Sequence, residues 1–361
     1  MRKSQYDVIV VGGRVAGAIT AALIAGEGHR VLLLDRSNPV RDTISTHFFR
    51  GARLVSILDR LGLLEDVLAT GSPPLGRQFV YSEENPEGLE QPPQNPGDFG
   101  FGLSVRRDTL DPMLLEHARN TGAEVRMGCW IKEVERAGDR VVGVAGTSAT
   151  GELNEGAQLV VGADGVHSFV AKALAAEYEE YAPPARGIYY CYVKGWASQE
   201  GGPPDAAEFS HIPGELAYVF PSNGGQTCIA LSLDQEDCKW LKRSATARFQ
   251  ERLQRHSGLM PRFTACTAVS RVLGHSPEPS YVRVPRGPGW ALVGDASIHS
   301  DPFAGQGMDM AGVHATFLGE EVNSWLSGKC SQEDALEAYH HRRNDDALDT
   351  YRQVVAEALQ I

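Results

Sequence analysis

VVGGRVAGAI, residues 10–19, contains the glycine turn that decides the fold. Gly12 and Gly17 stand where a dinucleotide-binding turn of the pattern G-x-G-x-x-G needs glycine, and Arg14 takes the place of the middle glycine. The β-branched run over residues 6–11 predicts a buried parallel strand before the turn. The alanine-rich run after the turn predicts a helix. This order predicts a phosphate-binding site at the start of that helix.

The helix predicted over residues 16–25 leads to a second buried strand, which the run RVLLLD predicts over residues 30–35. Asp35 ends this strand 23 positions after Gly12. About 20 positions are expected between such a turn and an acid that accepts hydrogen bonds from a ribose. The candidate nucleotide-binding residues of this segment are Gly12, Arg14, Val15, Ala16, Gly17, Asp35 and Arg36.

Arg14 allows two interpretations. Its side chain removes the unhindered backbone approach that a glycine offers to phosphates. Its guanidinium could instead lie beside a pyrophosphate as a charge partner, or it could point to solvent. The surrounding strand, helix and acid predict a nucleotide site under either interpretation.

The composition is that of a globular protein without a nucleic-acid partner. The 361 residues contain 34 Lys and Arg against 46 Asp and Glu, a formal net charge of −12 that argues against nucleic acid. No apolar run approaches the roughly 18 residues that a membrane span needs. The six cysteines form no C-x-x-C pair and no zinc-like cluster, so we expect reduced thiols, a cytoplasmic location and no metal. The sequence leaves the oligomeric state open.

The chain divides into an α/β region and an inserted region of different character. Residues 181–284 are rich in tyrosines, strand-like runs and turn signals, which predicts an antiparallel sheet with one helix over about 239–256. We therefore expect a Rossmann-like α/β domain that is interrupted by an α+β substrate domain. The expected parts are a discontinuous nucleotide domain (1–75, 101–180 and 285–330), a substrate domain (76–100 and 181–284) and a C-terminal helix (331–361).

Two further motifs follow strand-like runs: LVVGADGVHS over residues 159–168 and GWALVGDASIHSDPFAGQGMDMAGVHATFLGEEV over residues 289–322. Together with the glycine turn, they resemble the three signatures of FAD-dependent aromatic hydroxylases of the p-hydroxybenzoate hydroxylase type, the group A flavoprotein monooxygenases. The resemblance spans nearly the whole chain in the right order. It implies FAD as the cofactor and NADPH or NADH as a transient reductant.

The resemblance implies roles for particular residues. Asp295, after Gly294, matches the acid that holds the ribityl chain of FAD. Asp164 and Gly165 match a motif linked to both FAD and the nicotinamide cofactor, and Arg107 matches an arginine that reaches FAD. The P-x-x-G-Q-G loop beside the isoalloxazine ring is matched by Pro302 and Gly305, which we take as catalytic, and by Gln306, Gly307 and Met308. The sequence predicts a helix from Gly307 to about Leu326 after this loop. Backbone N–H groups at the start of that helix would stabilise negative charge on the reduced flavin.

The sequence departs from the family at two positions. The Asp-Gly motif usually ends in arginine, whereas Lys172 follows Val170 and Ala171 here, which leaves the use of a nicotinamide cofactor open. Many relatives have a histidine three residues after the late aspartate. This chain has Ile298 there and His299 next.

Side chains beside the expected flavin have more than one interpretation. His47, in the segment THFFR, could be a base, a substrate contact or a covalent flavin tether, or simply a hydrogen-bonded loop histidine. Arg50 could contact an FAD phosphate or solvent. His299 and Asp301 could be catalytic or could cap the loop. Five aromatic residues could line a substrate site or form core: Tyr189, Tyr190, Tyr192, Tyr218 and Phe220.

The resemblance implies a monooxygenase. Reduced FAD would react with O₂ to give a C4a-hydroperoxide, which would hydroxylate an aromatic or polycyclic small molecule. The alternative is an FAD-dependent reductase that resembles geranylgeranyl reductases, which share the fold and a similar P-F-x-G-Q-G loop, and that acts on an apolar unsaturated substrate. A halogenase is disfavoured because the chain has no W-x-W-x-I-P segment. A nucleotide-binding regulator without turnover would be consistent with Arg14.

Overall fold

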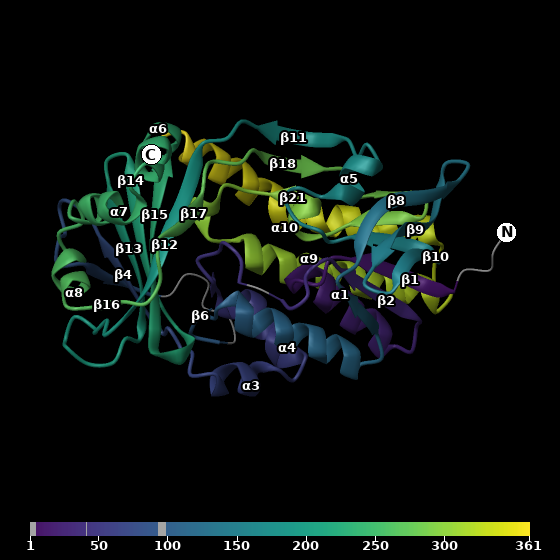
Figure 1. Ribbon diagram of the computed structural model, residues 1–361, viewed down its shortest axis with the longest axis horizontal. Coiled ribbons are helices and arrows are strands. Elements are labelled where there is room, and N and C mark those ends of the chain that lie inside the picture. The colour runs from purple at the N-terminus through teal and green to yellow at the C-terminus, as the bar shows by residue number, and fades with distance from the viewer. Residues whose placement is uncertain (1–4, 41, 93–98) are drawn as a thin grey trace.

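The computed structural model describes residues 5–40, 42–92 and 99–361. Two large sheets lie towards opposite ends of an elongated molecule (Figure 1). The predicted domain boundaries also include residues 1–4, 41 and 93–98, which lie outside the described residues.

The first sheet is the predicted parallel sheet. Its strands in spatial order are β19 (Arg286–Gly287), β20 (Trp290–Leu292), β10 (Gly151–Gly162), β1 (Tyr6–Val11), β2 (Val31–Asp35) and β7 (Glu124–Met127). All neighbours are parallel except β19, which is antiparallel to β20. The carboxyl ends of the parallel strands therefore meet at one edge, which is where open α/β sheets bind ligands.

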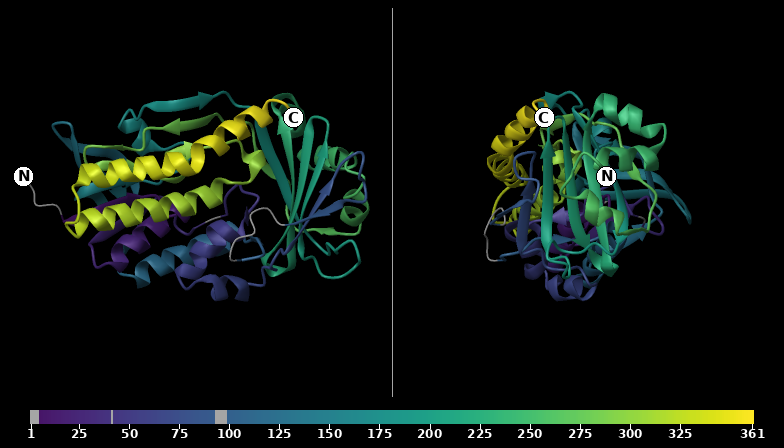
Figure 2. Two further views of the ribbon diagram at one scale, coloured as in Figure 1. Left: turned by 180° about the vertical axis from the view of Figure 1, so that it is seen from behind. Right: turned by 90° about the vertical axis from the view of Figure 1, so that its left-hand side faces the viewer.

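Helices cover one face of this sheet. They are α1 (Val15–Gly26), α4 (Arg107–Asn120), α9 (Gly307–Leu326) and α10 (Gln332–Ala358), and Figure 2 shows α9 and α10 side by side. The predicted helix over 307–326 is confirmed. The other face is covered by α5 (Phe169–Ala173) and a hairpin of β8 (Trp130–Ala137) and β9 (Arg140–Ser148).

The second sheet is largely antiparallel, as predicted. Its order is β16 (Thr267–Ala268), β12 (Arg186–Lys194), β15 (Gln226–Asp234), β14 (Glu215–Ser222), β13 (Ala206–Ile212), β4 (Arg77–Tyr81) and β5 (Leu89–Gln91), and β17 (Leu273–His275) also pairs with β12. The pairing of β13 with β4 is parallel. β4, which comes early in the chain, therefore lies beside a strand from the inserted region over residues 181–284.

The prediction of one helix over about 239–256 is wrong. The described chain has α6 (Gln235–Lys242), α7 (Ala245–Leu253) and α8 (Met260–Thr264) in this region. The backbone leaves the helical conformation at Ser244, with φ −158° and ψ 69°, and this break lets both flanking helices bury apolar residues against the same sheet face.

Smaller elements join the two sheets. The strand β3 (Phe48–Phe49) pairs with β6 (Leu103–Ser104). A wide helical turn (Gly51–Val55) is followed by α2 (Ser56–Arg60) and α3 (Leu64–Ala69). A three-stranded sheet consists of β11 (Tyr178–Ala182), β18 (Ser280–Arg283) and β21 (Ile298–His299). All six cysteines are free thiols. None of the helices in the described ranges is long and apolar enough to cross a membrane.

The glycine turn is built on close backbone contact. Gly12 has φ +109°, and a Cβ there would lie 2.3 Å from the carbonyl oxygen of Ala163. A Cβ on Gly17 would lie 1.8 Å from the carbonyl oxygen of Gly12. Only glycine at both positions lets α1 approach the strand ends this closely.

We expect Gly17→Ala to destabilise the protein by about 3 kcal/mol, because the rigid backbone cannot move away from the added methyl group. Gly26→Ala in the same helix is the matched control, since a Cβ there meets nothing within 4 Å. Thermal unfolding of both variants checks this. Equal melting temperatures would contradict the packing.

Candidate functional site

The three sequence motifs meet at the carboxyl edge of the first sheet. Ala163, which precedes the Asp-Gly motif, contacts the Gly12 turn as described above. Gly294 of the late motif packs on the start of α1, because a Cβ there would lie 2.9 Å from the Cβ of Ala16. One site therefore holds Gly12 and Gly294, which are 282 positions apart in the sequence.

Tyr281 on β18 ties two of these motifs together. Its hydroxyl lies 2.9 Å from the carbonyl oxygen of Val166 and 2.7 Å from that of Asp295. The guanidinium of Arg283 lies over the Tyr281 ring at 4.0 Å and donates to the carbonyl oxygen of Ala296. The sequence analysis missed Tyr281, because only its pairing next to β21 reveals the contact.

Asp35 lies at the mouth of the glycine turn, as expected for a ribose-binding acid. Its carboxylate accepts hydrogen bonds from the backbone N–H groups of Gly13 (2.6 Å) and Ser37 (2.7 Å). These bonds orient the carboxylate and leave further acceptor sites on its oxygens. Arg36 beside it is exposed.

Asp164 caps the short helix α5. Its carboxylate accepts hydrogen bonds from the Ser168 hydroxyl and from the backbone N–H groups of Phe169 and Val170. Burial raises the pKa of Asp164 despite these bonds. Gly165 follows with φ +84°. The motif thus shapes its own loop at the site.

The late motif positions an acid and a loop. The Asp295 side chain is 44% exposed, and its closest ion-pair partner is His299, whose Nδ1 is 3.6 Å away. Gly305 follows the turn Pro302–Ala304 and adopts the left-handed conformation, with φ +60° and ψ 35°. Gln306 comes next, and Gly307 and Met308 are the first two residues of α9.

Asp301 is a cap for this loop. It accepts hydrogen bonds from the N–H groups of Phe303 (3.1 Å) and Arg186 (2.9 Å), and so also joins the loop to β12. Burial raises its pKa. The Nε2 atom of neighbouring His299 is buried without a hydrogen-bond partner.

Arg50 fastens the same loop from the other side. Its guanidinium donates to the carbonyl oxygens of Gly305 (3.1 Å) and Ala304 (3.2 Å) and forms an ion pair with buried Asp309 (3.0 Å). The Arg50 side chain is only 11% exposed, so it does not face solvent. Asp309 was missed by the sequence analysis, although an acid in the first turn of a helix is a recognisable signal.

His47 is buried where the two large sheets meet. Its φ is +64°, its side chain is fully buried, and its Nε2 is hydrogen-bonded to the hydroxyl of Tyr192 on β12. The Nδ1 atom is buried without a hydrogen-bond partner. Burial lowers the pKa of His47 to about 3, and the positive charges of Arg107 and Arg106 act in the same direction. The imidazole is therefore neutral at physiological pH.

Tyr192 connects His47 to a charged group near the surface. Its hydroxyl donates to Asp42 Oδ2 at 3.4 Å, and Asp42 also accepts from Arg106 at 2.9 Å. The Arg106 guanidinium lies 4.6 Å from the centre of the Tyr192 ring. The Asp42 and Arg106 side chains are 22% and 23% exposed, so this chain of contacts leads from the buried imidazole towards solvent.

The two faces of β12 separate the aromatic candidates. Tyr190, Tyr192, Tyr218 and Phe220 pack with Phe48 on the face towards the first sheet. Tyr218 also donates a hydrogen bond to the carbonyl oxygen of Phe303 at 2.7 Å. Tyr189 points to the opposite face, against the cluster packed by α6 and α7. It cannot line the same site, because adjacent residues of a strand face opposite sides.

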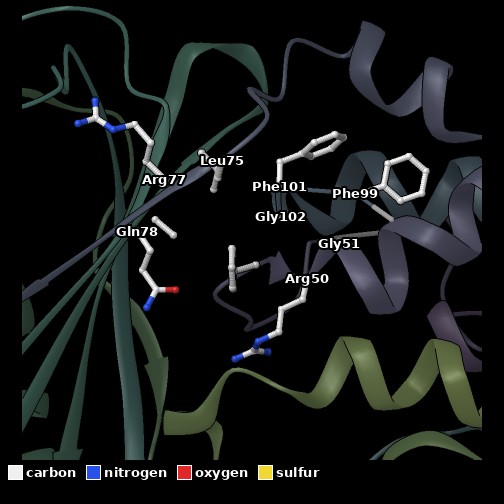
Figure 3. A pocket seen from close by; sticks show the side chains of 10 residues that line it. Arg50, Gly51, Leu75, Arg77, Gln78, Phe99, Phe101 and Gly102 are labelled. Atoms are coloured by element: carbon white, nitrogen blue, oxygen red, sulfur yellow. The ribbon is translucent and has the colours of Figure 1, made fainter. Parts of the chain in front are cut away.

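A small pocket opens beside this junction (Figure 3). Aromatic Phe48, Phe99 and Phe101 line it together with polar side chains. Its remaining lining residues are Arg50, Gly51, Leu75, Arg77, Gln78, Gly102 and Ala207. Arg50 thus contacts both the pocket and the Gly305 loop.

Arg14 does not simply point to solvent, because its side chain is held by an ion pair. Its guanidinium binds Asp111 of α4 at 2.9 Å, and the other oxygen of Asp111 binds Arg107 at 2.7 Å. Asp111 is completely buried, while the Arg14 side chain is 35% exposed. The sequence analysis missed Asp111, which is 97 residues away from its partner.

These residues fit FAD. The Gly12 turn leads into the N-terminus of α1, Asp35 and Asp295 offer carboxylates at two places on the site, and Arg14 lies beside the turn. The unpartnered Nδ1 of His47 lies beside the loop region as a further polar group. Within the described residues, no group of His, Cys, Asp or Glu could hold a metal ion.

The family model described as an FAD binding domain matches residues 5–354. The chain belongs to this family. Its cofactor is FAD, and it is a flavin-dependent oxidoreductase of the group A flavoprotein monooxygenase type, which the three motifs resemble.

Single relatives are similar in sequence or structure to most of the chain. Digeranylgeranylglycerophospholipid reductase 2 of Methanothermobacter thermautotrophicus is 27% identical over 88% of this chain and 77% of its own. Kynurenine 3-monooxygenase of Salinispora arenicola is 28% identical over 95% of this chain and 77% of its own. The structure of the myxobacterial chondrochloren halogenase CndH superposes with a TM-score of 0.82 and 23% identity, covering 97% of this chain and 82% of that one, which supports the fold.

We expect Asp295→Ala to weaken FAD binding about tenfold or more, because the carboxylate that would hold the ribityl chain is lost. The stability of the apoprotein should hardly change, since the ion-pair distance to His299 is as long as 3.6 Å. Flavin fluorescence titration and thermal unfolding check the two effects separately. Asp349→Ala on exposed α10 is the control. Unchanged flavin content would refute the role of Asp295.

The low pKa of His47 predicts a pH effect on stability. Unfolded His47 takes up a proton below its ordinary pKa of 6.5, but the folded protein does not until about pH 3. Stability is therefore lost as pH falls below 6.5, and His47 should contribute up to about 2 kcal/mol of the loss between pH 7 and pH 5. Denaturant unfolding should find a shallower pH slope in His47→Gln. Parallel slopes would contradict the neutral buried imidazole.

Proposed function

We propose that the protein is an FAD-dependent monooxygenase that hydroxylates an aromatic or polycyclic small molecule, with NADPH or NADH as the reductant. The observation that carries this proposal is the pocket lined by the rings of Phe48, Phe99 and Phe101 and by Arg50, which also holds the Gly305 loop. Flat rings pack well against aromatic side chains.

Bound FAD would supply the redox chemistry, in which substrate, O₂, NAD(P)H and a proton yield hydroxylated substrate, water and NAD(P)⁺. The chain must position the flavin and the substrate and exclude water. Arg50, Asp301 and Tyr218 hold the backbone of the loop over residues 302–305 from three sides. The N–H groups at the start of α9 would face the flavin and stabilise negative charge there.

We propose that the unpartnered Nδ1 of His47 forms a hydrogen bond with a polar substituent of the substrate. Tyr192 fixes the orientation of the ring through Nε2. A neutral imidazole can accept or donate at the free nitrogen, depending on its tautomer. A proton from a phenolic substrate would have a hydrogen-bonded route through Tyr192 to Asp42.

We also propose the FAD-contacting residues and the domain boundaries that the sequence predicts. FAD would contact the Gly12 turn, Asp35, Arg36, Arg107, Asp164, Gly165 and the 294–308 segment. The substrate domain would consist of residues 76–100 and 181–284, whose described strands form the second sheet except for β18 and the end of β11.

The second candidate is a reductase of the geranylgeranyl type. The relative from Methanothermobacter, at 27% identity, favours it. The pocket lining argues for the monooxygenase, since Arg50, Arg77 and Gln78 offer polar groups that an apolar isoprenoid chain does not need. Halogenation is supported by likeness of fold to halogenases such as CndH, and the W-x-W-x-I-P segment is absent from the sequence.

The test is to supply the FAD-loaded protein with NAD(P)H and ¹⁸O₂ and a panel of phenols, anilines, polycyclic aromatics and isoprenoid alkenes. We expect a product heavier by one ¹⁸O atom. Product labelled by deuteride from the nicotinamide without oxygen would establish the reductase instead. No NAD(P)H oxidation and no peroxide release would favour a regulator without turnover.

The same assay tests His47. His47→Gln should raise KM for a hydroxylated substrate about tenfold, while an analogue without the hydroxyl should be affected much less. Flavin that remained attached after denaturation of the wild type, but not of this variant, would identify His47 as a covalent tether.

A further inference from the structure

The strongest feature that the proposed reaction does not use is the carboxylate of Asp111. It is completely buried in α4, and each of its oxygens binds a different arginine: Oδ2 binds Arg14 at 2.9 Å and Oδ1 binds Arg107 at 2.7 Å. Arg14 comes from the glycine turn and Arg107 from the first residue of α4. One carboxylate therefore sets the positions of two guanidiniums from different elements.

The backbone of Arg14 does not need the freedom of glycine. Its φ of −88° and ψ of −169° are extended values that any residue adopts. The residue immediately precedes α1, at the end where free N–H groups and the helix dipole attract an anion. An arginine can therefore replace the middle glycine without distorting the turn, provided that its side chain is held aside.

Three arginines gather around the turn. The positive charges of Arg107 and Arg36 are close enough to act against that of Arg14, and the carboxylates of Asp111 and Asp35 act in its favour. The N-terminus of α1 adds positive potential. Arginines beside a helix N-terminus suit a ligand that carries two negative charges, as a diphosphate does.

We propose that Asp111 is a positioning residue that holds Arg14 and Arg107 as a two-armed clamp on the diphosphate of FAD. The Arg14 side chain then supplies the contact that the backbone of a glycine would give in the usual turn. Arg107, whose charge also lowers the pKa of His47, extends the clamp towards the junction of the two sheets. The clamp concerns cofactor binding and is independent of the reaction that the flavin performs.

A guanidinium contact differs from a backbone contact in its response to salt. Charge–charge attraction at a partly exposed side chain weakens as the Debye length shortens, whereas backbone N–H contacts depend on salt much less. The wild-type protein should therefore lose FAD affinity with rising salt more steeply than a variant without the arginine.

The experiment uses the full-length apoprotein and three probes: FAD, ADP and adenosine. ADP has the diphosphate, and adenosine has the same ring and ribose without it. Arg14→Ala should weaken FAD and ADP binding about tenfold to a hundredfold and change adenosine binding less than twofold. Arg14→Gly restores G-x-G-x-x-G, and it should still bind more weakly than the wild type.

Asp111→Asn tests the positioning role. It should lower the preference for ADP over adenosine about tenfold and flatten the salt dependence of FAD binding, which a purely structural residue would not do. Glu116→Gln and Arg119→Ala, an exposed pair on the same helix, are the controls. If Asp111→Asn does not fold, the Arg14 variants still decide the question. Wild-type ADP affinity in Arg14→Ala, or an equal loss for adenosine, would overturn the clamp.

Discussion

The approach of Gly12 to the carbonyl oxygen of Ala163 holds the first sheet and its site together. With Gly17 against the carbonyl oxygen of Gly12, this contact brings α1 onto the ends of β1 and β10 with no side chain between them. Because parallel strands end at one edge, every loop that follows a central strand then opens into the same space. The glycine turn, the Asp-Gly loop and the late Gly-Asp loop meet there for this reason.

Many of the polar side chains around that space hold the loops in place. Arg50 and Asp309, Asp301, Asp164 and Tyr281 each satisfy backbone or side-chain groups of the loops. Buried charges are stable only when paired and hydrogen-bonded, and these contacts meet that requirement. Such a network keeps loop backbone in one arrangement, which a redox cofactor needs if its ring is to meet a substrate in a fixed geometry.

The second sheet contributes through one of its faces. Alternation along β12 sends Tyr190 and Tyr192 towards the first sheet and Tyr189 towards the helices behind. Two hydrogen bonds join the second sheet to the Gly305 loop, from Tyr218 to Phe303 and from the backbone N–H of Arg186 to Asp301. The two sheets therefore act as one frame around His47.

The sequence by itself determined the order of the elements and the three motifs. Spacing and periodicity are local properties, so β1, β2 and α9 could be predicted nearly to the residue, as could the antiparallel character of the inserted region. The break at Ser244 could not be predicted, because it depends on how two helices share one sheet face. Only the tertiary structure decided that Asp111 joins Arg14 to Arg107, that Asp309 joins Arg50, and that Tyr192 holds His47. These pairs connect residues on different elements, and no local pattern records which side chains the folding of distant segments brings within hydrogen-bonding distance.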